Sequence, residues 1–397
     1  MQESEHKLPK GFIITTAEAA IKAPGRRDIV VISSTTPASA AGVFTRNVVK
    51  AAPVLLDMER LRDGCAQAVV INSGNANACT DRQGFANAVE MSAMVADALH
   101  IAVDNCLVAS TGVIGVQLPM ERIKPALYES LANPVNRTLL DAASAIMTTD
   151  TFPKAVSRDI ELASCTATVS AIAKGAGMIA PDMATLLCFV ITDLNIDHTA
   201  LQLALTEAVD KTFNRITVDA DTSTNDTVLV LANGQAGNER VVAHGYGFHS
   251  FRTVLQEMLM ELAVMCVKDG EGATKFVTIK VVGANSDADA NKLARTVANS
   301  LLVKTAICGG DANWGRIMAA IGYSGVTFNP NCVDVYFDDV LVVKDGYGVN
   351  NDSLAYEVFK KNDIVITINM NTGQGAAKIF TCDLTEDYVK INAHYRS

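Results

Sequence analysis

The sequence has few of the features that mark metal centres, disulfide-stapled domains or membrane proteins. Its nine cysteines are an odd number and no two form a Cys-x-x-Cys pair, which disfavours both a disulfide framework and a structural zinc site. No stretch reaches the roughly 18 uncharged apolar residues that a membrane-spanning helix needs. The first ten residues carry charges of both signs and no apolar run, unlike a signal or transit peptide. These absences predict a cytoplasmic protein with no membrane partner.

Histidine motifs and excess positive charge are also missing. None of the six histidines lies in His-Glu-x-x-His, and no Gly-x-Ser-x-Gly motif is present, so histidine-based or metal-based catalysis has little support. The 33 Lys and Arg residues against 43 Asp and Glu residues give a net charge of −10, the wrong sign for binding nucleic acid. We therefore expect neither a metal site nor a nucleic-acid partner.

What is present is a large apolar fraction with alternating strand and helix patterns. Hydrophobic residues make up 49% of the 397 residues and charged residues 19%, which excludes a disordered chain. Residues 69–72 read as a buried strand and residues 85–99 as a helix. Further strands are expected at 29–32, 166–172, 186–192, 227–231, 277–282, 333–343, 364–368 and 378–382, and further helices at 119–131, 138–147, 198–211, 248–267 and 287–301. The pattern predicts a mixed α/β fold, with a main domain at 1–275 and a second at 276–397.

Polar loops rich in Gly, Thr or Asn interrupt these apolar segments. They are expected at 72–80, 110–115, 148–151 and 219–226. Taken singly, each reads as an ordinary turn or cap. Together they expose hydroxyls and backbone N–H groups, which suit a pocket for a small polar substrate that carries carboxylates.

The segment from Ala173 to Thr192 allows three interpretations. Gly175 to Ala180 fits Gly-x-Gly-x-x-Ala, but Pro181 and a strand follow where a dinucleotide fingerprint requires a helix. An ordinary structural loop and strand is the second interpretation. In the third, Thr185 is a nucleophile freed by cleavage after Ala184, because an N-terminal Thr carries its own base in an α-amine whose pKa is about 7.7–8.0. The residues alone do not decide among them.

A longer set of motifs resembles one enzyme family. Lys174-Gly-Ala-Gly-Met-Ile-Ala-Pro-Asp-Met-Ala-Thr185 is similar to the self-cleavage signature of the bifunctional ornithine acetyltransferases of arginine biosynthesis. Blocks that also resemble the family lie at 42–47, 51–54, 72–77, 110–115, 147–151, 213–216, 221–226, 269–275, 311–316 and 383–388. The resemblance thus extends across nearly the whole chain. The terminal Ser397 stands where Thr is common, which keeps the hydroxyl.

The resemblance implies a role for each matching residue. Cleavage between Ala184 and Thr185 would give chains 1–184 and 185–397, with Thr185 as the nucleophile. Thr111 and Gly112 would stabilise the oxyanion. Substrate contacts would come from Thr148, Lys174, Thr185, Glu271, Asn392 and Ser397.

The family also implies a fold and a reaction. We expect an αββα sandwich of the self-cleaving, N-terminal-Thr kind with a smaller C-terminal α/β domain, assembled as α2β2. The expected reaction moves acetyl from N2-acetyl-L-ornithine to L-glutamate through an acetyl-Thr intermediate, with no cofactor. Use of acetyl-CoA as a co-substrate stays open. The alternatives are a related self-cleaving amidase or peptidase that hydrolyses an N-acyl amino acid, and an uncut amino-acid-binding protein.

Overall fold

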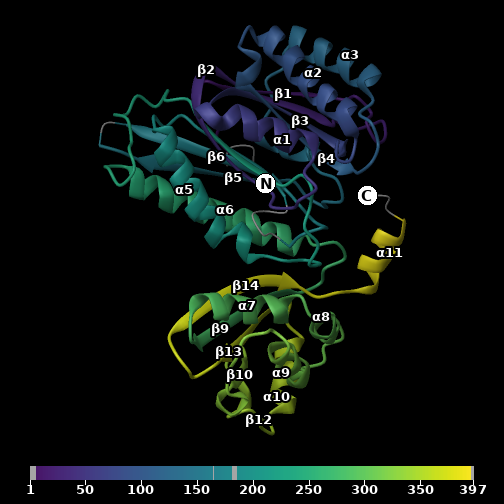
Figure 1. The fold of residues 1–397 in the computed structure, drawn as a ribbon, viewed down its shortest axis with the longest axis vertical. Helices are drawn as coiled ribbons and strands as arrows, with labels where there is room; N and C mark the ends of the chain where they lie inside the picture. The colour runs from purple at the N-terminus through teal and green to yellow at the C-terminus, as the bar shows by residue number, and fades with distance from the viewer. Residues whose placement is uncertain (1–5, 164, 181–185, 395–397) are drawn as a thin grey trace.

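The computed structural model describes residues 6–163, 165–180 and 186–394. Within these ranges the strands form one sheet of eight strands and one of six (Figure 1). No helix of the described residues is long and apolar enough to cross a membrane.

The larger sheet has the strand order β4-β3-β2-β8-β7-β6-β5, and β1 pairs with β2. Its strands are β1 (Phe12–Ala17), β2 (Ile29–Phe44), β3 (Cys65–Asn75), β4 (Cys106–Val113), β5 (Lys154–Glu161), β6 (Thr166–Lys174), β7 (Leu187–Thr192) and β8 (Thr227–Ala232). The long strand β2 joins two halves of this sheet. Its first part, Ile29–Ser33, pairs with β3, and Ser39–Phe44 pairs with β8 after a break in register.

The two halves pack face to face, and helices cover both outer faces. One buried cluster joins Val30, Ile71 and Leu107 of the first half to Phe189 and Leu229 of the second. The helices of this part are α1 (Ala52–Arg60), α2 (Asp81–Leu99), α3 (Met120–Ala132), α4 (Leu139–Ala145), α5 (His198–Lys211) and α6 (Phe248–Lys268). The first three pack on the first half and the last two on the second (Figure 1). The predicted αββα sandwich is confirmed.

The smaller sheet has the order β12-β11-β10-β13-β9-β14 and a core of its own. Its strands are β9 (Phe276–Ala284), β10 (Asp334–Phe337), β11 (Val340–Lys344), β12 (Tyr347–Gly348), β13 (Asp363–Asn369) and β14 (Gly375–Cys382). Its helices are α7 (Asp287–Ala298), α8 (Leu301–Cys308), α9 (Trp314–Gly322) and α10 (Asp352–Phe359). After β14 the chain runs to α11 (Glu386–His394), which extends away from the smaller sheet at the side of the molecule (Figure 1).

The structure corrects some of the sequence-based boundaries. Residues 72–75 and 110–113, expected in loops, are the ends of β3 and β4. The single helix expected at 287–301 is two helices, because the Ser300 side chain accepts a hydrogen bond from the Val303 N–H and starts α8 anew. The single strand expected at 333–343 is the antiparallel pair β10 and β11. The predictions missed β1, β4, β5, β12, α1, α8, α9, α10 and α11.

Candidate active site

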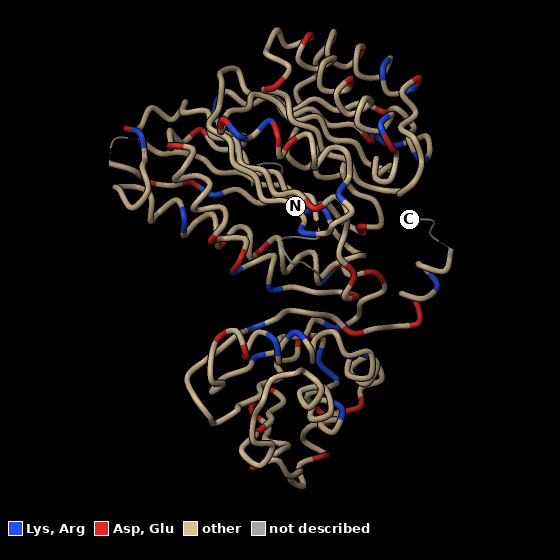
Figure 2. Tube along the Cα trace, in the orientation of Figure 1, with Lys and Arg blue, Asp and Glu red and all other residues tan. Residues whose placement is uncertain are grey.

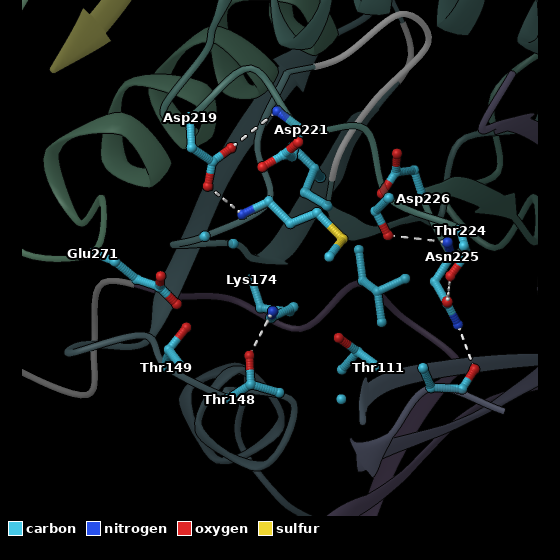
Figure 3. A pocket seen from close by; sticks show the side chains of 18 of the residues that line it. Thr111, Thr148, Thr149, Lys174, Asp219, Asp221, Thr224, Asn225, Asp226 and Glu271 are labelled. Atoms are coloured by element: carbon cyan, nitrogen blue, oxygen red, sulfur yellow. Dashed lines mark hydrogen bonds between the residues drawn. The ribbon is translucent and has the colours of Figure 1, made fainter. Parts of the chain in front are cut away.

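A cavity opens where β3, β4, β6 and β7 come together, and α11 forms part of its rim. Its volume is about 210 Å³. It is lined by Ala76, Thr111, Gly112, Ile114, Thr148, Thr149, Lys174, Gly175, Gly177, Met178, Leu186, Leu187, Asp219, Asp221, Ser223, Thr224, Asn225, Asp226, Glu271, Tyr388 and Asn392. Figure 3 shows Lys174, Glu271 and several Thr side chains facing this space.

Six of the residues that the sequence singled out meet in this one cavity. They are Thr111, Gly112, Thr148, Lys174, Glu271 and Asn392. Ala184, Thr185 and Ser397 lie outside the described residues. The cavity is nevertheless lined by Leu186 and Leu187, which directly follow the expected cleavage point.

Lys174 brings the positive charge of the cavity. It ends β6, and its Nζ donates a hydrogen bond to Thr148 Oγ1 over 2.7 Å. The same Nζ lies 3.8 Å from a carboxylate oxygen of Asp150. Burial raises the pKa of the Asp150 carboxyl, but the nearby Lys174 and Lys154 cations more than offset this and hold it below its ordinary value. Asp150 is therefore an anion that fixes Lys174.

A buried ion network that sequence reasoning missed supports this side of the cavity. The fully buried Lys154 Nζ donates to Asp150, over 2.8 Å, and to Asp269. Asp150 also accepts from the backbone N–H of Gly175 over 2.7 Å, and Asp269 accepts from Thr151. The network thus ties β5 and β6 to the loop after α6. Lys154 begins a strand of ordinary composition, so no sequence signal marked it.

Glu271 brings negative charge to the cavity. Its carboxylate accepts a hydrogen bond from Asn392 Nδ2 of α11 over 2.7 Å. A Cβ added at Gly177 would lie 2.4 Å from the Glu271 carboxyl carbon, so only glycine allows this approach. A cation and an anion on the same cavity match the two charged ends of an amino acid.

A second anchor for α11 lies at Asp219, which the sequence placed only within a polar loop. Asp219 accepts hydrogen bonds from the backbone N–H groups of Met178 and Ile179 over 2.6 and 2.8 Å. The Tyr388 hydroxyl of α11 donates to the same carboxyl over 3.3 Å. Burial raises the pKa of Tyr388, and the Asp219 charge raises it further. Asp219 therefore joins the glycine-rich segment to α11.

Thr111 and Gly112 lie at the end of β4, against β3. Gly112 has φ +135°, and a Cβ there would lie 2.3 Å from the Gly74 carbonyl carbon. Only glycine fits between the two strands at this point.

The positions of positively and negatively charged residues are interspersed along the chain in Figure 2. Within the described residues, no group of three His, Cys, Asp or Glu side chains is arranged to hold a metal ion.

Comparisons with known proteins agree on one family. Residues 13–397 match the ArgJ family. The arginine biosynthesis bifunctional protein ArgJ of Geobacter sulfurreducens is 50% identical over 390 residues, which cover 98% of this chain and 99% of that protein. The protein of the same name from Symbiobacterium thermophilum is 48% identical over 392 residues, 98% of each chain. A crystal structure of arginine biosynthesis bifunctional protein ArgJ from Bacillus halodurans has 44% identity and a TM-score of 0.50, covering 52% of this chain and 98% of that one. The chain belongs to the ArgJ family.

Proposed function

We propose that this chain is the acetyltransferase of arginine biosynthesis that moves acetyl from N2-acetyl-L-ornithine to L-glutamate. The observation that carries the proposal is the convergence of Thr111, Thr148, Lys174, Glu271 and Asn392 on one cavity, although they lie far apart in the chain. The cavity offers a cation, an anion and several hydroxyls, which together fit an N-acylated amino acid.

The proposed chemistry uses Thr185 as an N-terminal nucleophile. Its Oγ attacks the acetyl carbonyl, its α-amine takes the hydroxyl proton, and the same proton passes to the nitrogen of the leaving ornithine. This leaves an acetyl ester on Thr185. The amine of glutamate then attacks the ester, giving N-acetylglutamate and the free hydroxyl, with ping-pong kinetics.

The cavity residues would supply the remaining roles. Thr111 and Gly112 would donate hydrogen bonds to the oxyanion, and removing such a donor costs about 3–4 kcal/mol of transition-state stabilisation. Lys174 would pair with a substrate carboxylate and Glu271 with the ammonium of ornithine. Thr148, Asn392 and Ser397 would complete the substrate contacts. No metal or organic cofactor enters these steps, because the acetyl group travels on the enzyme.

Acetyl-CoA is a second acetyl donor that we propose on the strength of the relatives, whose name describes them as bifunctional. In the same first half-reaction, the thiolate of CoA would leave in place of ornithine. The product would again be N-acetylglutamate.

We also propose that the chain is cut between Ala184 and Thr185 and assembles as α2β2 in the cytoplasm. The solved relative from Bacillus halodurans supports the cut, since its chain is about half as long as this one. The separate core of the smaller sheet supports a division into domains 1–275 and 276–397.

Mass spectrometry and electrophoresis of the purified protein test the proposal. We expect a fragment that begins at Thr185 and gains one acetyl group with acetylornithine. Thr185→Ala should give a full-length, inactive chain, and normal transfer by this variant would refute the assigned nucleophile. Repeated turnover of acetylornithine to ornithine and acetate without glutamate, beyond the one ornithine per site that forms the acetyl-enzyme, would indicate an amidase instead. An uncut, inactive wild-type chain would indicate a binding protein.

A further inference from the structure

Three buried polar side chains form a connected group directly behind Thr111 and Gly112. Ser110 Oγ donates a hydrogen bond to Asn72 Oδ1 over 2.6 Å. The backbone carbonyl of Ser110 accepts one from Asn225 Nδ2 over 2.8 Å. Asn72, Ser110 and Asn225 are 0%, 1% and 7% exposed. The peptide that leads into Thr111 is therefore held from two sides.

The side-chain amide of Asn225 has its orientation fixed by its partners. Nδ2 donates to the carbonyls of Ala76, over 2.6 Å, and Ser110, and both of these can only accept. Oδ1 accepts from Thr224 Oγ1 over 2.6 Å (Figure 3). Both amide hydrogens are thus engaged by protein groups. Asn225 therefore has no amide hydrogen left to donate to a bound substrate.

These hydrogen bonds cross between the two halves of the sandwich. Ala76 directly follows β3, and Ser110 lies in β4, so both belong to the first half. Asn225 lies two residues before β8, which runs parallel to β7 in the second half. Asn225 is itself held locally, because its N–H donates to Ser223 Oγ and its carbonyl accepts from Thr227 Oγ1. One amide therefore fixes the spacing between the end of β4 and the strands β7 and β8.

We propose that Asn225 is a positioning residue for the transfer reaction, which holds Thr111 and Gly112 at the correct distance from the start of β7. This inference rests on the proposed function, in which those two residues stabilise the oxyanion. Oxyanion contacts act only in the transition state, so their misplacement lowers kcat and leaves substrate affinity nearly unchanged. Misplacement by about 1 Å is enough to cost about 100-fold in rate.

The test compares Asn225→Asp with a matched control. Asn238 is also 7% exposed, donates through Nδ2 to the carbonyls of Asn195 and Glu239, and accepts from the Asn195 N–H. It has the same bonding pattern but does not line the cavity. Asn225→Asp keeps the side-chain shape and removes the N–H donors. We expect its kcat to fall about 10- to 100-fold with KM within twofold, while Asn238→Asp keeps both constants at a similar loss of melting temperature.

A second variant covers the case in which Asn225→Asp does not fold or is not cut. Thr224→Val keeps the amide but removes the hydroxyl that orients it, and we expect a smaller loss of kcat at constant KM. Unchanged kcat in the soluble, processed variant, or an equal loss in Asn238→Asp, would overturn the inference. These outcomes are distinct from failure of the proposed function, which would appear as a wild-type protein that makes no N-acetylglutamate.

Discussion

Asn392 and Glu271 lie 121 positions apart in the sequence, yet their side chains share a hydrogen bond of 2.7 Å at the rim of the cavity. Asn392 also donates to the Tyr388 carbonyl of its own helix. The last helix of the described chain therefore orients the carboxylate that we assign to the substrate ammonium. α11 is a part of the site rather than a loose tail.

Asn392→Leu should weaken substrate binding. The change removes the donor that orients Glu271 at similar side-chain size, and a hydrogen bond to a charged group contributes about 1.5–3 kcal/mol. We expect KM for acetylornithine to rise about tenfold or more, with a smaller change in kcat. Steady-state kinetics check this, with Lys390→Gln on the same helix as the control. Equal KM values for Asn392→Leu and the wild type would contradict it.

Gly112→Ala should abolish most of the turnover. The new Cβ would lie 2.3 Å from the Gly74 backbone, so β3 and β4 must move apart where the oxyanion donors lie. We expect kcat to fall about 100-fold. Gly115→Ala is the matched control, since Gly115 has φ +79° but nothing within 4 Å of the added Cβ. If both variants lose activity equally, backbone strain alone explains the loss.

Lys154→Met should destabilise the protein strongly. The substitution leaves Asp150 and Asp269 buried without their shared cation, and breaking a buried ion pair in this way costs about 3–5 kcal/mol. Urea unfolding measures the change in the free energy of unfolding. Lys268→Met removes an exposed pair with Asp363 and should cost at most about 1 kcal/mol. A similar small cost for Lys154→Met would show that Lys154 does not hold the network together.

Asp226→Asn should make stability less sensitive to pH. Burial raises the pKa of Asp226 well above its ordinary value, and Oδ2 has no hydrogen-bond partner among the described residues. The unfolded chain loses this proton near pH 4, whereas the raised pKa makes the folded chain lose it only at higher pH. Between these two pKa values the wild-type free energy of unfolding falls with rising pH, by up to about 1.4 kcal/mol per unit. Asn cannot ionise.

The advantage of Asp226→Asn over the wild type should therefore grow from pH 5 to pH 8. Urea unfolding of both proteins at each pH measures it. A difference that stays constant over this range would show that Asp226 ionises in the folded protein as it does in the unfolded chain.

The sequence predicted the regular parts of the fold better than the irregular ones. Helices α5 and α6 follow a helical spacing of apolar residues, and their predicted ranges are confirmed within one residue. Polar residues interrupt the apolar runs of strands β1 and β5, Thr in β1 and Ser and charged residues in β5. The strand predictions relied on such runs and therefore missed both strands. Helix α11 is held mainly by polar contacts with distant residues, which a local pattern does not show.

The site was only partly predictable for the same reason. The motif resemblance identified Thr111, Lys174 and Glu271, because their surroundings in the sequence are distinctive. The supporting residues Lys154 and Asn225 have no such local signal. Their importance comes from burial and from partners on other strands, which only the folded chain brings together.

The single strand β2 belongs to both layers of the sandwich, and a continuous apolar interface lies between those layers. Separating the two layers would expose the apolar side chains between them to water, at a large cost in free energy. The two layers are therefore expected to stay packed together during turnover, while α11 is held at the cavity by the hydrogen bonds of Tyr388 to Asp219 and of Asn392 to Glu271.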